Sequence, residues 1–187
     1  MSAVLVSGAA AHVSEVANAL RAHSASVTEV VDRSTLPEVC AAAGAGAFDS
    51  YIQLPQNFQA QGETAIRRVH DFYAGGVLGR FLALAAALPS LTSDARVTFV
   101  LGQLPSEVGS VDDREARESL TRVLAHAAQA DADGKLTVRL VSAGCGPDEI
   151  ASIALGLGPS KHEVDRLADA RYPEWRMEML SLAFVQT

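Results

Sequence analysis

The sequence predicts an α/β fold, with a doubly wound and mainly parallel sheet of about six strands in one domain over residues 1–187. Two observations support this prediction. Short runs of β-branched and aliphatic residues alternate along the chain with segments whose apolar residues recur at helical spacing. Apolar residues make up 49% of the chain and charged residues 20%, which suffices for one core. Because crossover helices join parallel strands, this alternation predicts a sheet covered on both faces.

The opening stretch, Ala3–Asp32, predicts a strand, a tight turn, a helix and a second strand. The first strand ends at Gly8, and the second, Ser26–Val31, ends at Asp32. The helix between them has an apolar face made by Val13, Val16, Ala17 and Leu20. Asp32 follows the glycine turn by roughly 20 residues, a spacing typical of a dinucleotide-binding βαβ unit. That unit needs three glycines in its turn, and only Gly8 is present.

The central third of the chain predicts short elements and then one long apolar helix. A helix is predicted over Leu36–Ala43, a strand over Phe48–Leu54 that Pro55 ends, and a short helix over Thr64–Phe72. In this short helix we expect Ile66, Val69 and Phe72 to face the core. The segment Tyr73–Leu88 is apolar nearly all round, with Arg80 as its charged residue, so we expect it to be buried on more than one face.

The last third continues the alternation. Strands are predicted over Arg96–Leu101, Lys135–Ser142 and Met179–Val185, and helices over Asp112–Ala130, Ile150–Leu155 and His162–Leu167. The helix Asp112–Ala130 carries one apolar stripe, made by Leu120, Val123, Leu124 and Ala127. Charged residues lie opposite this stripe, as in a helix with one face on the core.

The charge of the chain narrows its partners and its location. With 15 basic and 22 acidic side chains the net charge is −7, so nucleic acid and anionic membrane surfaces would repel it on average. The N-terminus has no basic and apolar leader. The most apolar run, Val77–Leu91, is interrupted by Arg80 and Pro89, so we expect no membrane span and a cytoplasmic location.

Cysteine and histidine do not indicate a metal centre. Cys40 and Cys145 stand alone in their neighbourhoods, which is typical of reduced thiols, and the five histidines lack zinc-type spacing. We therefore expect no metal. Cys145 is the one nucleophile with unusual surroundings, between Gly144 and Gly146 after a predicted strand. A small thiol in a glycine turn is more often a packing residue than a catalyst.

Three stretches resemble the short-chain dehydrogenase/reductase (SDR) family. VLVSGAAAHVSEVANAL, at Val4–Leu20, is similar to the family's strand, T-G-x-x-x-G-x-G turn and helix. Gly75–Gly102 is similar to its long fourth helix and the strand that delivers a catalytic serine, and Arg114–Gly144 to its fifth helix and next strand. The resemblance implies a Rossmann-like sheet. Between Asp32 and Phe48 there is room for one short helix, so we expect the family's third strand to be absent.

The cofactor positions of the family are degenerate in this chain. The glycine turn retains Gly8, but His12 and Ser14 stand where the second and third glycines belong. An imidazole at His12 would sit where backbone should meet phosphate. Asp32 could accept a bond from a ribose hydroxyl, and Arg33 could suit a 2′-phosphate, but beside a broken turn a surface acid is the simpler interpretation. We therefore expect no cofactor-binding residues, and NAD(P) only if the chain is an atypical enzyme.

The catalytic positions of the family are also lost. Its asparagine falls near Gly76, its serine near Leu101 or Gly102, and its Tyr-x-x-x-Lys pair on Ser110 and Arg114. The family's tyrosine exchanges a proton because a lysine ammonium lowers its pKa, and a serine hydroxyl has no comparable acidity. No residue at these positions can serve as required, so we expect no catalytic residues.

Two hypotheses of function follow, with a third kept open. The first is a catalytically inactive SDR-like subunit with a structural or regulatory role. It would form a homodimer, or a hetero-oligomer with an active SDR subunit, through helices 73–88 and 112–130, the pair that the resemblance implies for assembly. The alternative is an NAD(P)-dependent oxidoreductase that acts on a carbonyl or alcohol with atypical site residues. The third is a small-molecule sensor that uses the old pocket.

Overall fold

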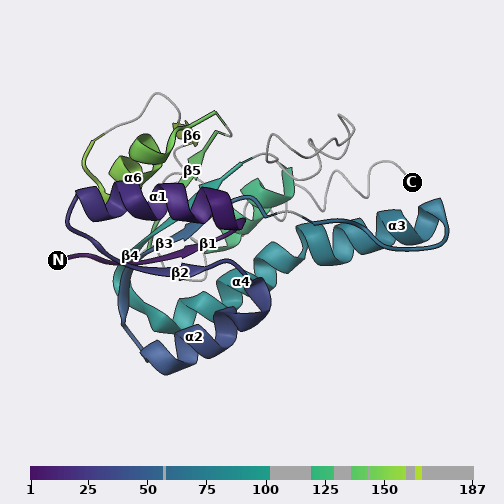
Figure 1. Cartoon of the computed structure of the whole chain (residues 1–187), viewed down its shortest axis with the longest axis horizontal. Coiled ribbons are helices and arrows are strands. Elements are labelled where there is room, and N and C mark those ends of the chain that lie inside the picture. The colour runs from purple at the N-terminus through teal and green to yellow at the C-terminus, as the bar shows by residue number, and fades with distance from the viewer. Residues whose placement is uncertain (57, 102–118, 129–135, 143, 159–162, 166–187) are drawn as a thin grey trace, which may run out of the picture.

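The computed structural model describes residues 1–56, 58–101, 119–128, 136–142, 144–158 and 163–165. Within them lies a six-stranded sheet in the order β2-β1-β3-β4-β5-β6 (Figure 1). The strands are β1 Ala3–Ser7, β2 Ser26–Val30, β3 Phe48–Gln53, β4 Leu91–Val100, β5 Thr137–Val141 and β6 Glu163–Asp165. Strands β1 to β5 are parallel, and the short β6 pairs antiparallel with β5. The predicted α/β class and mainly parallel sheet are confirmed.

Helices cover both faces of the sheet. One face carries α1 (Ala10–Ala22) and α6 (Pro147–Leu155), and the other carries α2 (Leu36–Ala43), α4 (Gly79–Ala87) and the helical residues 119–128. Successive side chains along each strand point to opposite faces of the sheet, so both faces contribute to the core. In β1, Val4 and Val6 pack in the cluster beneath α1 and α6, whereas Leu5 packs in the cluster beneath α2 and α4. The sheet is therefore buried on both faces, as the apolar strands predict.

The connection between β2 and β3 is short. It consists of a 3₁₀ turn, Arg33–Thr35, and the helix α2, and it returns the chain directly to β3 beside β1. Strand β2 is consequently the edge of the described sheet. This agrees with the expectation that the third strand of an SDR sheet is absent from this segment.

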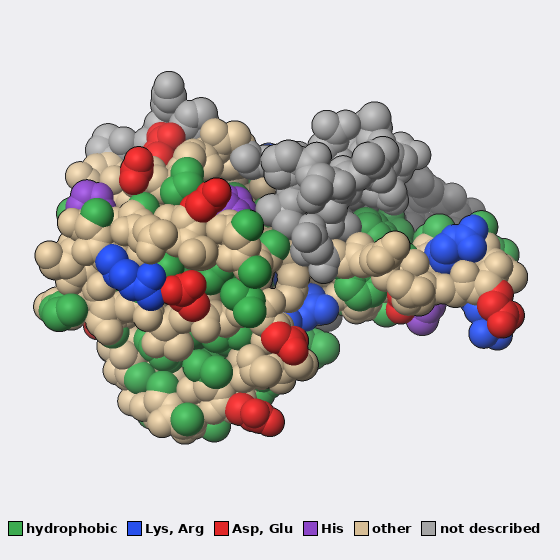
Figure 2. Space-filling model, viewed as in Figure 1, with side chains coloured by type: hydrophobic (Ala, Val, Ile, Leu, Met, Phe, Trp, Pro, Cys, Tyr) green, Lys and Arg blue, Asp and Glu red, His purple; other side chains and the backbone are tan. Residues whose placement is uncertain are grey.

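The region predicted as a short helix and a long one forms a single bent helical run. It comprises α3 (Ala65–Asp71), a π-helical turn (Phe72–Val77), α4 and a 3₁₀ turn (Leu88–Ser90). The part formed by residues 58–77 projects from the body as an arm (Figures 1 and 2). By length and composition alone, Ala65–Ser90 is one helix of the described chain long enough and apolar enough to cross a membrane, a test that core helices of soluble proteins also pass.

Two predictions about this run are wrong. Ile66 and Val69, expected to face the core, are 83% and 57% exposed, because α3 lies on the arm and has no sheet beneath it. The long helix is not buried on several faces either. Val77, Ala83 and Leu84 are buried, as are Gly79 and Ala87, but Tyr73, Leu78 and Leu82 reach solvent. Helical periodicity identifies a shared face without identifying what covers it.

The C-terminal third differs from its prediction at one point. Residues 163–165, expected to begin a helix, form β6, because pairing with β5 satisfies the edge of the sheet there. The predicted helix Asp112–Ala130 is helical over the described residues 119–128, where Thr121, Leu124, Ala125 and Ala128 are buried. The predicted strand Met179–Val185 lies outside the described residues.

A polar network ties α4 to the C-terminal ends of two strands. The Arg80 guanidinium donates to the Gln53 side-chain oxygen Oε1 (2.8 Å), to the backbone oxygens of Gln53 and Val100 (3.1 Å each) and to Thr121 Oγ1 (3.0 Å). Gln53 Nε2 donates in turn to the backbone oxygen of Arg80 (3.0 Å). Because Gln53 ends β3 and Val100 ends β4, this one side chain joins α4, both strands and residues 119–128.

Replacing the Arg80 guanidinium with an apolar chain should destabilise the fold strongly. Arg80→Met leaves two backbone oxygens and the Gln53 side chain without their donor, and we expect the free energy of unfolding to fall by about 2–4 kcal/mol. Chemical denaturation followed by circular dichroism measures the loss. The matched control is Arg67→Met on the exposed arm, expected to change stability by less than about 0.5 kcal/mol. Equal losses in the two variants would contradict the role of Arg80.

Candidate functional site

The order of the strands locates the candidate site. The chain runs outward from β1 to β2 on one side and from β3 to β5 on the other, so the order reverses between β1 and β3. In open α/β sheets, ligands bind beyond the carboxyl ends of the strands at this switch point. Here Ser7 and Gln53 are register partners at the ends of β1 and β3. The segments that follow them, from Gly8 and from Leu54, would form the walls of a cofactor crevice.

These two segments are hydrogen-bonded to each other. Leu54 N–H donates to the Ser7 backbone oxygen (2.8 Å), and Ala9 N–H donates to the Pro55 backbone oxygen (3.1 Å). Gly8 N–H donates to the Val30 backbone oxygen (3.2 Å) on the other side. The parallel ladder therefore continues past the ends of β1 and β3. The N–H groups of Gly8 and Ala9, at the start of this turn, are thus bonded to protein carbonyls.

Gly8 is required by this close approach. It has a φ of +153°, and a Cβ atom built on it would lie 2.6 Å from the Leu54 Cβ and 3.2 Å from the Pro55 oxygen. The one glycine kept from the turn thus allows β1 and β3 segments to pack together. Pyrophosphate is not needed to explain it.

His12 and Ser14 lie in the first turns of α1, which begins at Ala10, two residues after Gly8. Ser14 is exposed. His12 is half-buried, and its Nδ1 atom is buried with no hydrogen-bond partner among the described residues. Burial lowers the pKa of His12, an effect opposed by the nearby Glu15 carboxylate. The imidazole is therefore neutral near pH 7 and supplies no positive charge for a phosphate.

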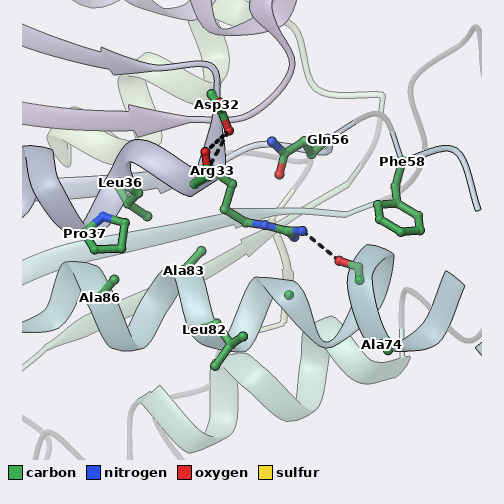
Figure 3. A pocket seen from close by; sticks show the side chains of 13 residues that line it. Asp32, Arg33, Leu36, Pro37, Gln56, Phe58, Ala74, Leu82, Ala83 and Ala86 are labelled. Carbon is green, nitrogen blue, oxygen red and sulfur yellow. Dashed lines mark hydrogen bonds between the residues drawn. The ribbon is translucent and has the colours of Figure 1, made fainter. Parts of the chain in front are cut away.

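A cavity of about 460 Å³ lies beyond the end of β2 (Figure 3). Asp32 stands at its rim, where its carboxylate caps the 3₁₀ turn by accepting from Ser34 N (2.9 Å) and Ser34 Oγ (2.7 Å). These bonds, led by the Ser34 hydroxyl, lower the pKa of the exposed Asp32. Arg33 crosses the cavity, and its Nη2 donates to the Gly75 backbone oxygen (2.8 Å).

The far wall of this cavity is the π-helical turn. Phe58 covers Gly75 and Gly76 so closely that Cβ atoms there would lie 2.5 and 2.9 Å from its ring. Gly79 lies one turn later, against the Arg33 guanidinium. A Cβ atom built on Gly79 would lie 2.3 Å from Arg33 Nη1. Gly76, the position of the family's asparagine, is therefore covered by an aromatic ring. The arginine expected to suit a phosphate is a brace between the end of β2 and the helical run.

Sequence reasoning missed the polar residues that fill the interior beside the switch point. Tyr51 is fully buried, and its hydroxyl lies 2.8 Å from Ser7 Oγ and accepts from Gln53 Nε2 (3.2 Å). Burial raises the pKa of Tyr51, a shift that the Ser7 and Gln53 bonds oppose. The phenol therefore stays protonated at neutral pH and does not act as a general base. The polar residues Asp49, Ser50 and Gln53 on β3 were the available signal, because burying them requires partners.

The positions of the family's catalytic serine, tyrosine and lysine, and the Cys145 thiol, come last. Leu101 is buried after β4, with its N–H bonded to the Val141 backbone oxygen (2.8 Å). Gly102, Ser110 and Arg114 lie outside the described residues. Cys145 is buried after β5, and desolvation, with the nearby Glu149 carboxylate adding to it, raises the pKa of this thiol to about 12.

Filling the space at Gly8 should separate the two segments. Gly8→Ala places a methyl group against Leu54 in a backbone conformation that favours glycine, and overpacking of this kind costs about 1–3 kcal/mol. Thermal and chemical denaturation measure this loss. Gly144→Ala is the control, because a Cβ at Gly144 meets nothing within 4 Å, and its stability should stay within about 0.5 kcal/mol of the parent. A Gly8→Ala protein as stable as that control would refute the close packing.

The Cys145 thiol should be inert in the folded protein. A thiol with a pKa near 12 is almost entirely protonated at pH 8, so we expect iodoacetamide to alkylate it about a thousandfold more slowly than in urea-unfolded chain. Peptide mass spectrometry of the wild-type protein separates Cys145 from Cys40. Rapid alkylation of folded Cys145 at pH 8 would show an accessible thiolate and reopen a nucleophilic role.

Comparison with known proteins places this geometry among solved structures. No family model and no curated protein matches the sequence. A small-chain dehydrogenase superposes with a TM-score of 0.61 at 15% identity, over 83% of this chain and 88% of its own. BdcA from E. coli in complex with NADPH gives a TM-score of 0.56 at 14% identity, over 91% and 90%.

A short-chain dehydrogenase/reductase from Serratia marcescens gives a TM-score of 0.61 at 16% identity, over 89% of this chain and 93% of its own. At sequence identities of 14–16%, structural similarity is evidence about the fold. The resemblance stated from the sequence is confirmed at that level: the chain adopts the fold of the short-chain dehydrogenases/reductases.

Proposed function

We propose that this chain is a non-catalytic protein on an SDR scaffold, a structural or regulatory subunit that does not bind a dinucleotide. The observation that carries the proposal is the bonded switch point. Leu54 N–H to Ser7 and Ala9 N–H to Pro55 occupy the place where a cofactor crevice would open. A pyrophosphate would have to break the Ala9 bond and push Leu54 away from Gly8.

Electrostatics at the edge of the sheet supports the same function. A dinucleotide carries at least two negative charges and needs N–H groups or cations aimed at them. His12 is neutral, and Arg33 is bonded to Gly75. The hydroxyl of Tyr51 is enclosed in hydrogen bonds and too weakly acidic for proton transfer. Arg33 and Tyr51 are thus engaged with other parts of the chain, and His12 offers a phosphate no positive charge.

The helical layer supports a role in assembly. Tyr73, Leu78 and Leu82 leave apolar surface on the helical run, and exposed apolar surface of this kind is typical of protein interfaces. The subunit would act in the cytoplasm as a homodimer or beside an active SDR subunit, through helices 73–88 and 112–130.

A second candidate, an NAD(P)-dependent oxidoreductase with atypical site residues, is favoured by one observation. The cavity beside Asp32 and Arg33 lies where an acid and an arginine after β2 select between NAD and NADP in dinucleotide-binding folds. BdcA, which shares the fold, is known in complex with NADPH. In this alternative, the Arg33–Gly75 bond opens when the ligand enters, and an adenosine occupies the cavity.

Cofactor binding distinguishes the two candidates. A ligand at one hundred times its Kd stabilises the folded state by roughly 2.7 kcal/mol, which is visible as a thermal shift. With NADH or NADPH at millimolar concentration we expect no shift for this chain, and a clear shift for BdcA as the positive control. A shift with either cofactor, lost in Arg33→Ala, would reject the non-catalytic proposal and select the oxidoreductase.

A further inference from the structure

Strand β2, Ser26–Val30, forms one edge of the described sheet. It pairs with β1 on its inner side, and among the described residues no strand lies on its outer side. Figure 1 shows β2 between α1 and α2, the helices that cover the two faces of the sheet beside it. Ser26 and Glu29 are exposed, and Val27 and Thr28 are half-buried. Solvent therefore reaches the outer edge of this strand.

Hydrogen bonds at the two ends of β2 show which of its backbone groups face outward. Ser26 N–H donates to a backbone oxygen on the β1 side (2.9 Å), and the Val30 backbone oxygen accepts from an N–H on that side (3.2 Å). In a parallel pair, a residue directs its N–H and its C=O to the same neighbouring strand, and alternate residues face opposite sides. Thr28 therefore also faces β1. The N–H and C=O groups of Val27 and Glu29 face outward, where the described chain offers them no strand.

This edge lacks the features that usually prevent an exposed strand from pairing. Natural edge strands are often very short, bulged, or interrupted by Lys or Pro. The sequence of β2, SVTEV, contains no Lys, Pro or Gly, and its β-branched residues favour a strand. Its register with β1 is continuous along all five residues. The opposite edge is different, because β6 has three residues and its pairing with β5 is irregular. Strand β2 is therefore able to accept a further strand.

We propose that β2 pairs with the β2 strand of a second copy of this chain, antiparallel and about a two-fold axis at Thr28. In this register Val27 of each copy lies opposite Glu29 of the other, and the two Thr28 residues face each other. Val27 and Glu29 then form the hydrogen-bonded pairs of an antiparallel ladder, so all four outward groups of each copy are bonded. Since a two-fold contact uses the same edge of both copies, it closes at two chains.

Side chains favour this register over the two registers nearest to it. Shifting one strand by two residues in one direction sets Glu29 opposite Glu29, and like charges directly opposite are destabilising. Shifting it in the other direction sets Glu29 opposite Ala25, whose N–H already donates to the Leu20 backbone oxygen (3.2 Å). In the proposed register Glu29 lies opposite a valine and keeps its ion pair with Arg21 of α1. The two Thr28 side chains form a favourable cross-strand pair.

A second copy suits this edge better than a charged segment of another protein. The one carboxylate of the strand, Glu29, is neutralised by Arg21, so the strand itself offers little charge to attract a basic or an acidic segment. It offers outward backbone groups in an order that complements itself. The contact lies apart from the helices 73–88 and 112–130 named in the proposed function, and it does not depend on whether those helices also pair.

Disulfide cross-linking tests the register. In the proposed pair the two Thr28 Cα atoms lie about 4.5 Å apart, within the range that a disulfide spans. We therefore expect Thr28→Cys to form covalent dimers on mild oxidation, measured by non-reducing electrophoresis. Ser26→Cys is the matched control, because Ser26 is more exposed but its two copies would lie at least roughly 13 Å apart. The wild type is a second control, since Cys40 and Cys145 are buried.

Two substitutions of Glu29 separate the backbone contribution from that of the side chain. Glu29→Ala and Glu29→Pro both lose the ion pair with Arg21, but Glu29→Pro also removes an outward N–H and, by symmetry, two of the four hydrogen bonds. Proline is tolerated where an edge strand directs its N–H to solvent, so circular dichroism should be unchanged. We expect Glu29→Pro to dimerise at least about tenfold more weakly than Glu29→Ala in sedimentation velocity.

Cross-linking of Thr28→Cys without cross-linking of Ser26→Cys would support the pairing. Equal cross-linking at the two positions, no cross-linking at Thr28→Cys, or equal affinities of the two Glu29 variants would overturn it. A wild-type chain that stays monomeric at high micromolar concentration would do the same. If monomeric Thr28→Cys cross-linked to a different protein in a cell extract, the edge would serve a strand of another sequence. A dimer unaffected by these substitutions would reject this contact and leave the proposed function standing.

Discussion

Two backbone hydrogen bonds, Leu54 N–H to Ser7 and Ala9 N–H to Pro55, continue the pairing of β1 and β3 beyond the strands themselves. In a doubly wound sheet, these two strands leave the switch point toward opposite faces, and the space between their loops is the ligand crevice. Continued pairing uses the Ala9 N–H group, which lies in the turn between β1 and α1. The continued pairing holds the segments after β1 and β3 against each other beyond the ends of the strands. A turn that packs on Leu54 needs one small residue, and Gly8 is that residue.

The interior beside this edge is polar, and it is held by partners from several elements. Ser7, Tyr51 and Gln53 form a chain of hydrogen bonds within the sheet, and Gln53 passes the chain to Arg80 on α4. Buried polar networks are stabilising when every member is satisfied and costly when one is missing. Arg80 satisfies two strand-end carbonyls at once, which fixes α4 against β3 and β4. Fixing α4 in turn fixes the direction in which the helical run leaves the body.

The alternation of strands and helices could be predicted from sequence because it rests on local periodicity. The strand β2, the helix α2 and the strand β3 were predicted to within one residue at each end. Periodicity failed where the answer depended on tertiary context. The apolar spacing of Ile66 and Val69 is real, but nothing local says whether a sheet or solvent lies opposite it. The π turn was also beyond prediction, since its five-residue spacing resembles an interruption of the α-helical pattern. The sequence shows His12 and Ser14 where the family's second and third glycines belong, whereas the close approach of Leu54 to Gly8 depends on contacts between distant segments.

The short connection between β2 and β3 explains why Arg33 is hydrogen-bonded to the helical run. In an SDR-like sheet with a third strand, the chain after β2 continues outward; here it turns back at once through α2, which packs beside α4. That path carries Arg33 over the π turn, where Gly75 accepts its hydrogen bond and Gly79 leaves room for its guanidinium. Burial lowers the pKa of Arg33, so its charge is partly desolvated even without a ligand, and the bond to Gly75 compensates that loss. A phosphate would have to compete with this bond and draw Arg33 away from the helical run. The shortened connection therefore carries Arg33 from the end of β2 to the helical run, where the Gly75 backbone oxygen accepts from its guanidinium.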